Sequence, residues 1–441
     1  MAEHFGRSLR WDIYEEHLNE GAFRWTQWEN ALDAPDYTLE EVAELEEPVA
    51  AHVDALVLGG EPVAKRLLVP ALADEPERVV AAALALLGAK ETFGPAAMLA
   101  ALPAAEPPAL GALRRAFELS SSAAISADLS SLLKKADGLP ELFALVLDLQ
   151  GSHGLATAPL CTPFLTHPEP QVAAAALRAV SRARLPLESA VLQRALDSAE
   201  PALRDAAIVV GLMGGHRSAW AACQAVAESR APGGRLPLLI LGMSGDERDV
   251  KRLLELLPNA KLQRDVLWAL GFSGRVAAAD ACVELMRQKP VAALAGEAFS
   301  AITGLRLAEQ YAAPREEEDD ALPPLEEEDL DADLSAKPED SLPLPQHDTV
   351  TTWWKEARQR MDVKQRYLGG QPFTPQALLE ALVSAPMRRR HALALELSLR
   401  SRGAIQIPTR GFVSRQVAAS KEARSVPASS ISRPFAEGLR G

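Results

Sequence analysis

The chain has 441 residues, of which 48% are hydrophobic but only 5% aromatic, and its formal net charge at pH 7 is −14. It is long enough for several domains or for one extended array. Because the apolar residues are mostly Ala, Leu and Val, they favour helices packed closely on helices, and we expect an all-α protein.

Composition also argues against membrane and disulfide-stapled classes. No window approaches about 18 uninterrupted apolar residues, and the first residues lack the apolar core of a signal peptide. Cys161, Cys223 and Cys282 form no CxxC pair, and an odd number of cysteines argues against a disulfide framework. We expect a cytoplasmic protein without a membrane partner.

The N-terminal residues 1–55 differ in composition from those that follow. They contain Trp11, Trp25 and Trp28, and two amphipathic stretches that predict helices. Thr38 and Glu41 have the spacing of a capping box, in which each side chain bonds the backbone amide of the other residue. We interpret this region as a helical cap on the end of a repeat array. A peptide-docking surface made by the same tryptophans is the alternative.

Residues 56–311 repeat with a period close to 30. Gly214, Gly245, Gly274 and Gly304 follow one another at intervals of 31, 29 and 30 residues, and each follows an apolar run such as LWALGFS. A unit of two short helices with this period is typical of an α-solenoid. We predict about seven or eight HEAT-like helical-hairpin repeats wound into a right-handed α-solenoid. The four glycines are predicted to end helices in the left-handed conformation.

The recurring GxxG pattern has two chemical interpretations that the sequence disfavours. A KH-type RNA clamp uses one GxxG in a mixed α/β domain with basic flanks, whereas here the pattern recurs in an acidic array. A nucleophile elbow needs G-x-S-x-G after a strand, but Ser244 and Ser273 are each followed directly by glycine. Helix capping accounts for the pattern at every repeat.

Residues 312–347 are acidic and rich in proline. They hold 13 acidic and 2 basic residues, a net charge of −11. Such a segment cannot bury a core, so we expect a disordered linker. A regulated docking strand for a basic partner is the alternative. A separate hypothesis is internal regulation, in which the segment folds back on the basic C-terminal region and masks it until a partner competes. Deleting residues 316–333 would then raise affinity for anionic partners in a salt-sensitive way.

The C-terminal part of the chain has the opposite charge. Residues 351–441 carry 16 basic and 6 acidic side chains, a net charge of +10. We expect a basic helical region at 348–410 and a flexible tail at 411–441. Salt-sensitive nucleic-acid binding by the basic region is an alternative function. The net charge of −12 on residues 1–311 disfavours it, because an acidic array repels phosphate.

Three helices are expected within the basic region. The first covers residues 353–369 and ends at Gly369. Thr374 as N-cap and Pro375 at the first helical position predict the start of the second. The third covers residues 388–403.

No constellation for catalysis or metal binding stands out. None of the eight histidines lies in an HExxH, H-x-H or His/Cys ligand pattern, and no P-loop or dinucleotide fingerprint occurs. His52 and Asp54 are close in sequence, but a lone His on a helix is most often structural. The sequence therefore indicates no catalytic, cofactor-binding or metal-binding residue. An enzyme of unknown reaction, with a pocket between repeats, stays an alternative.

Five segments together resemble one known family. They are HVDALVLGG (52–60), AFSAITGL (298–305), LPLP (342–345), RYLGGQPFT (366–374) and RRRHALALELSLR (388–400). In this order they resemble an uncharacterised proteobacterial family of HEAT-like repeat proteins. Its members occur in several copies in myxobacteria and are often encoded near type VI secretion genes. The resemblance implies a fold and a genomic setting, and it carries over no catalytic residue.

These observations together predict a non-enzymatic scaffold or adaptor. It would bind another protein, either a type VI secretion component or its cargo, on the concave surface that α-solenoids commonly offer. Trp353, Trp354, Arg366 and Tyr367 are the candidate contact residues, because aromatic residues and Arg dominate binding hot spots. Core packing of the C-terminal helices against the end of the repeats is the alternative role for these four residues.

Overall fold

The computed structural model describes residues 9–89, 93–120, 123–134, 139–314 and 337–432, together with Ala436 and Leu439. These residues form 22 α-helices, several short 3-10 turns and two strands of two residues each, so the all-α prediction is confirmed. Most of the acidic segment, residues 315–336, lies outside the described residues, and its role as linker or docking strand stays a prediction. Among the described helices, none is long and apolar enough to cross a membrane.

The helices of the first third of the chain are α1 (Trp11–Ala31), α2 (Leu39–Leu58), α3 (Gly60–Val63), α4 (Pro76–Gly88), α5 (Phe93–Ala101), α6 (Pro107–Leu119), α7 (Ala123–Leu132) and α8 (Pro140–Ser152). The middle third contains α9 (Ala158–Cys161), α10 (Pro170–Ala183), α11 (Ser189–Leu196), α12 (Pro201–Gly214), α13 (Arg217–Ser229), α14 (Arg235–Ser244), α15 (Glu247–Leu256), α16 (Gln263–Ser273), α17 (Val276–Leu285) and α18 (Ala292–Thr303). The last third contains α19 (His347–Ala357), α20 (Pro375–Ser384), α21 (Met387–Arg400) and α22 (Val413–Ser425).

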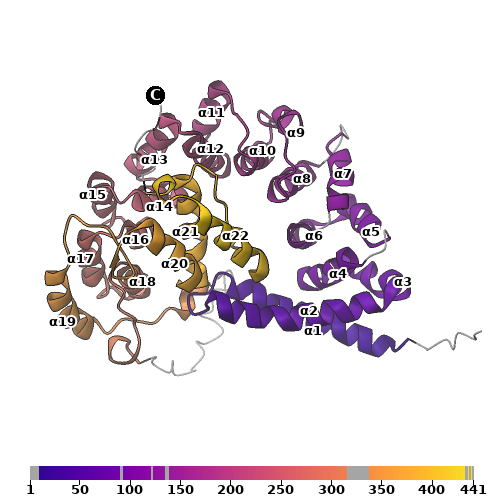
Figure 1. Ribbon diagram of the computed structural model, residues 1–441, viewed down its shortest axis with the longest axis horizontal. Helices are drawn as coiled ribbons and strands as arrows, with labels where there is room; N and C mark the ends of the chain where they lie inside the picture. The colour runs from indigo at the N-terminus through magenta and orange to yellow at the C-terminus, as the bar shows by residue number, and fades with distance from the viewer. Residues whose placement is uncertain are drawn as a thin grey trace, which may run out of the picture.

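The helices from α3 to α18 follow an arc with two layers (Figure 1). The even-numbered helices form the inner layer and contact one another in succession, while the odd-numbered helices lie outside them. Helices α20 to α22 lie inside the arc, between the long pair α1 and α2 and the last helices of the arc (Figure 1). The chain therefore fills much of the concave side with its own C-terminal region.

Local sequence explains where the inner helices begin and why they are buried. Helices α4, α10 and α12 each start with proline, whose missing amide proton is no loss at the first helical position. In α4 every residue from Val79 to Leu87 is buried. A helix that is apolar all round needs neighbours on all sides, and an inner-layer position provides them.

Left-handed glycines end the inner helices of the second half. Gly245, Gly274 and Gly304 follow α14, α16 and α18 with φ angles of 64°, 65° and 77°. At α12 the position differs from the prediction. Gly214 is the last helical residue, and Gly215 has the left-handed conformation, with φ of 79°. The left-handed cap therefore lies one residue later than predicted, at the second of two consecutive glycines.

Replacing Gly274 by Ala is expected to lower the free energy of unfolding by more than about 1 kcal/mol, because a positive φ disfavours any side chain. A Cβ at this position would also collide with the carbonyl oxygen of Tyr367. Gly111→Ala is the matched control: it lies inside α6, and a Cβ there meets nothing within 4 Å. That variant should gain about 0.5–1 kcal/mol. Urea unfolding measures the stability of both variants. An equal change in the two free energies of unfolding would contradict the close packing at Gly274.

A β-hairpin stands where the sequence predicted the end of a helix at Gly369. Helix α19 ends at Ala357, and the strands β1 (Tyr367–Leu368) and β2 (Gln371–Pro372) pair antiparallel around Gly369 and Gly370. These two glycines have φ of 57° and 78°, as a tight hairpin turn requires. Their amides donate to carbonyl oxygens of α18, Gly369 to Ala301 (2.8 Å) and Gly370 to Ile302 (2.9 Å). The hairpin thus satisfies carbonyls that the end of α18 leaves without helical partners.

The described residues form two large hydrophobic cores and a small one between them. The N-terminal core is built from residues 18–149, and the C-terminal core from residues 156–431. Met387 at the start of α21 and Val413 at the start of α22 belong to the N-terminal core, although the remainder of both helices packs in the C-terminal core. The C-terminal region therefore joins the two ends of the arc.

The ends of the chain differ in part from the predicted organisation. The capping box of Thr38 and Glu41 is confirmed at the start of α2, but α2 runs across the expected boundary at residue 55. Within the tail that was expected to be flexible, residues 413–425 form α22, which packs against α2 and α20. The reason is that side chains from distant parts of the chain hold α22 in place.

Candidate binding cleft inside the arc

The turn between α1 and α2 caps the N-terminal end of α21, and helix α2 caps that of α22. The amides of Met387 and Arg388 in the first turn of α21 donate to the carbonyl oxygens of Tyr37 (2.9 Å) and Ala34 (3.0 Å). At the start of α22 the amide of Val413 donates to Oε1 of Glu46 (2.7 Å). These amides have no partner within their own helices, so the N-terminal pair holds the C-terminal region in place.

Ionic contacts strengthen this junction. Arg410 donates to both carboxylate oxygens of Asp33 (2.7 and 2.8 Å), and Nε2 of His391 lies 3.2 Å from the same carboxylate. Burial alone would raise the pKa of Asp33, but the hydrogen bonds from His391 and Arg410 outweigh it and hold that pKa well below its usual range. The negative form of Asp33 is therefore favoured where the two ends of the arc meet.

The arginines at the start of α21 make contacts inside the molecule. Arg388 contacts Glu297 (3.2 Å) and Glu339 (2.9 Å), a residue of the 3-10 turn before α19. Arg389 lies over the ring of Phe272, 4.0 Å from its centroid. These contacts offset the unfavourable position of positive charges at the N-terminal end of a helix.

Arg390 is fully buried and has no acidic partner among the described residues. Its guanidinium donates to the carbonyl oxygen of Leu382 (2.6 Å) and to Oε1 of Gln416 (2.7 Å). Burial lowers its pKa to about 10. Arg390 thereby joins α20, α21 and α22 through hydrogen bonds alone.

The structure places the four predicted contact residues at the joint between the C-terminal region and the end of the arc. Trp354 is buried against Phe299 and donates from Nε1 to Asp280 (2.9 Å), and Trp353 is half-buried beside it. The Tyr367 hydroxyl accepts from the amide of Asp362 (2.8 Å). Their side chains thus make intramolecular contacts.

Arg366, the fourth candidate, is held even more tightly. It donates through two nitrogens to the fully buried carboxylate of Glu396 (2.6 and 2.9 Å). Its guanidinium carbon lies 3.8 Å from the ring centroid of Phe373. A role of the four residues in binding a partner stays a prediction, and of the aromatic three only Trp353 keeps part of its ring accessible.

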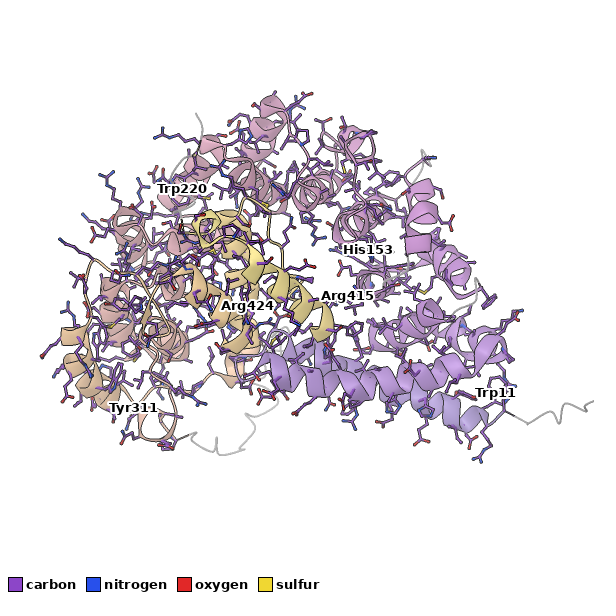
Figure 2. All side chains as sticks on the ribbon, in the orientation of Figure 1. Trp11, His153, Trp220, Tyr311, Arg415 and Arg424 are labelled. Atoms are coloured by element: carbon purple, nitrogen blue, oxygen red, sulfur yellow. The ribbon has the colours of Figure 1, made fainter. Side chains whose placement is uncertain are left out.

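A large open cleft remains on the inner side of the arc. Its volume is about 970 Å³, and its two walls come from distant parts of the chain. One wall is formed by the C-terminal ends of α6, α8 and α10, and the other by residues 403–411 and α22. Arg415 lies on α22 across from His153, which follows α8 (Figure 2).

Arginine is the dominant charged residue of this basic cleft. The six arginines in its walls are Arg114, Arg115, Arg182, Arg184, Arg410 and Arg415, against two carboxylates, Glu118 and Glu422. Within the described residues, Arg182 and Arg415 donate only to backbone carbonyl oxygens, of Asp148 (3.1 Å) and Glu118 (3.4 Å). Arg184 is exposed and pairs with no group in the described part of the chain. Three guanidinium groups therefore have no carboxylate partner among the residues that the structure describes.

Sequence reasoning did not find the basic cleft. Its walls come from segments about residues 114–119, 151–154, 182–184 and 403–426, which share no motif or spacing. One residue of the cleft has an unusual backbone conformation: Arg184 has a positive φ of 54°, which is uncommon for a residue other than glycine. Sequence alone does not show this feature.

The groups that most often serve as nucleophiles or metal ligands are poorly placed for such roles. Burial raises the pKa of the Cys161 thiol to about 11 and that of the Cys282 thiol to about 12, and it also raises that of Cys223. These thiols stay protonated, and a protonated thiol is a weak nucleophile. The described residues contain no group of three or more His, Cys, Asp or Glu side chains arranged to hold a metal ion.

His52 meets His17, and not Asp54 as its sequence neighbourhood suggested, with 3.0 Å between their Nδ1 atoms. Burial and the neighbouring His17 both lower the pKa of His52, with Glu16, Glu20 and Arg24 also acting on it. Because the folded-state pKa of His52 lies below the unfolded value of about 6.5, the free energy of unfolding decreases as the pH falls below about 6.5.

We expect His52→Gln to remove this acid sensitivity. Thermal unfolding of both proteins between neutral and mildly acidic pH measures the difference. A wild-type curve parallel to that of the variant would contradict the role of the histidine pair.

Comparisons with known proteins add no relative. No protein-family model matches the chain, and no curated protein matches it.

Proposed function

We propose that this protein is a right-handed α-solenoid of HEAT-like repeats that acts as a non-enzymatic scaffold or adaptor and binds another protein. The observation that carries the proposal is the two-layer arc of paired helices with an open cleft on its inner side. Arrays of this kind commonly use an extended concave surface for binding. Here the chain's own C-terminal region narrows that surface to the basic cleft.

The internal use of basic charge supports a protein partner over nucleic acid. Part of the basic charge of the C-terminal region is engaged with carboxylates of the arc, as in the pairs of Arg358 with Asp280 and Arg388 with Glu297. A surface that binds nucleic acid needs several free cations along a phosphate backbone. The buried thiols likewise give little support to an enzyme that works through a cysteine.

The resemblance noted in the sequence suggests where to search for the partner. Type VI secretion components and their cargo form the class to test first. This association is part of the proposal, and it rests on the resemblance alone.

Affinity purification of the tagged full-length protein from its native host, at low and at moderate salt, tests the proposal. We expect a protein that co-purifies in stoichiometric amount. Purified separately and mixed, the two should form one species in size-exclusion chromatography with light scattering. Failure of every co-purified candidate to form such a complex would overturn the scaffold proposal. Nucleic acid that is released by moderate salt would instead support the nucleic-acid alternative.

A further inference from the structure

We infer that the basic cleft binds an extended acidic segment of a partner protein, with apolar side chains among its carboxylates. This inference rests on the proposed function, because it assigns the place and the chemistry of partner binding. Three features of the cleft carry it: its local charge, the free backbone along one wall, and the absence of aromatic rings in its lining.

The charge of the cleft contrasts with that of the whole protein. The chain has a net charge of −14, yet six arginines line this cleft against two carboxylates. Arg182, Arg184 and Arg415 are the three for which the described part of the chain supplies no carboxylate partner. Arginine binds carboxylates with two parallel hydrogen bonds, so carboxylates of a partner would satisfy guanidinium groups that the chain leaves unpaired.

The backbone of one wall is suited to an extended ligand. Residues 405–408 form neither helix nor strand, and the amides of Gln406 and Ile407 donate to no group in the described part of the chain. Successive amides of an extended chain point to opposite sides, so one of these two amides can pair with the backbone of an extended peptide, which is a common way of binding peptides. The side chain of Gln406 donates to the carbonyl oxygen of Arg182 (2.9 Å), so the two walls touch beside this segment, and a peptide that pairs with it would lie next to Arg182 and Arg184.

The remaining lining favours a peptide over nucleic acid. Among the described residues the cleft has apolar side chains, such as Leu119, Ile405 and Val426, but no Phe, Tyr or Trp. Proteins that bind single-stranded nucleic acid stack bases on aromatic rings, which this cleft does not offer. The acidic remainder of the chain would repel a long polyanion within a Debye length of roughly 10 Å, whereas a short acidic segment contacts only the cleft.

Fluorescence anisotropy with defined probes tests the inference on the full-length protein. The first probe is a short labelled peptide of Glu, Asp and Leu. Its neutral counterpart has Gln and Asn in place of the acids, and an oligothymidine of similar length represents nucleic acid. The test variant is Arg184→Glu with Arg415→Glu. The control variant is Arg194→Glu with Arg248→Glu, which makes the same charge change on exposed residues of the outer helices α11 and α15.

We expect the acidic peptide to bind the wild-type protein and the control variant with similar affinity, more weakly as salt is added. The test variant should bind at least about tenfold more weakly, because two attractions become repulsions. The corresponding Gln substitutions should cause a smaller loss. Circular dichroism and thermal unfolding confirm that each variant folds, and the Gln variant replaces the Glu variant if the latter does not.

Three results would overturn the inference. The first is an affinity of the acidic peptide weaker than about 1 mM. The second is an equal loss in the test and control variants. The third is binding of oligothymidine that is as tight as that of the acidic peptide and equally sensitive to the test variant, which would make the cleft a nucleic-acid site.

The partner itself separates this inference from the scaffold proposal. A partner that binds the wild-type protein and the test variant equally well would overturn the cleft assignment and leave the scaffold proposal standing. If no partner forms a complex although the acidic peptide binds in the cleft, the scaffold proposal fails and the cleft remains a site for acidic peptides.

Discussion

Replacing Glu396 by Ala is expected to lower the free energy of unfolding by about 3–5 kcal/mol, because removal of one member of a buried ionic cluster leaves the others uncompensated. The Glu396 carboxylate is fully buried between two arginines. It accepts from Arg366 (2.6 and 2.9 Å) and from Nε of Arg400 (2.8 Å). Without it, the guanidinium groups of Arg366 and Arg400 would lose the carboxylate that lies between them.

Urea unfolding of the purified variants measures this effect. Glu380→Ala is the control, because Glu380 is an exposed residue on α20, and its loss should change stability by less than about 0.5 kcal/mol. Glu396→Gln keeps the shape of the side chain and should fall between the two. Equal stability of Glu396→Ala and Glu380→Ala would show that the cluster contributes nothing to the joint.

The same cluster should make the protein sensitive to acid. Burial would raise the pKa of Glu396, but the attraction of Arg366 and Arg400 outweighs it and lowers that pKa. Glu339 behaves alike, because its hydrogen bonds with Arg264 and Arg388 overcome burial and lower its pKa to about 2. A lowered folded-state pKa gives stability that is present above the unfolded value and lost below it. Unfolding should therefore become easier as the pH falls from about 4.3 towards 2.

Replacing Trp28 by Ala is expected to destabilise the protein by about 3–5 kcal/mol, as is typical for a large buried aromatic residue. Trp28 is fully buried in α1, lies 5.3 Å from the ring centroid of Phe412, and donates from Nε1 to Glu46 (3.1 Å). Glu46 also caps α22, so the loss should weaken the attachment of the C-terminal region as well as the N-terminal core.

Trp11→Ala on the same helix is the matched control. Trp11 is half-buried and lies 4.2 Å from the guanidinium carbon of Arg66, so its loss should cost much less. Calorimetric unfolding measures stability, and hydrogen exchange of α22 reports its attachment. Retained stability of Trp28→Ala would contradict the interpretation of these tryptophans as core. It would instead favour the alternative that they form a docking surface.

Predictions that depend on neighbouring residues agree with the structure. The Thr38 capping box and the start of α20 after Thr374 involve side chains within one helical turn. Such signals are local, so sequence alone is enough to find them.

Predictions failed where distant groups decide the outcome. The hairpin at Gly369 replaces a predicted helix because its amides serve the carbonyl oxygens of α18. Helix α22 was missed because its buried stripe is partly polar: Gln416 and Ser420 lie in it beside Val413 and Ala423. That stripe shows no apolar period, and its stability comes from contacts with Arg390 and Glu46.

Sequence alone was enough to predict the helical class, several helix starts and ends, and the opposite charges of the two parts of the chain, because these depend on composition and on residues within a few turns. The role of the basic charge depends on the tertiary structure. The fold pairs Arg388 and Arg389 with Glu297 and Arg366 with Glu396, while Arg184 and Arg415 lie on different walls of the basic cleft. Coulomb attraction and burial depend on distance in space, and no spacing along the chain records which arginine finds a partner.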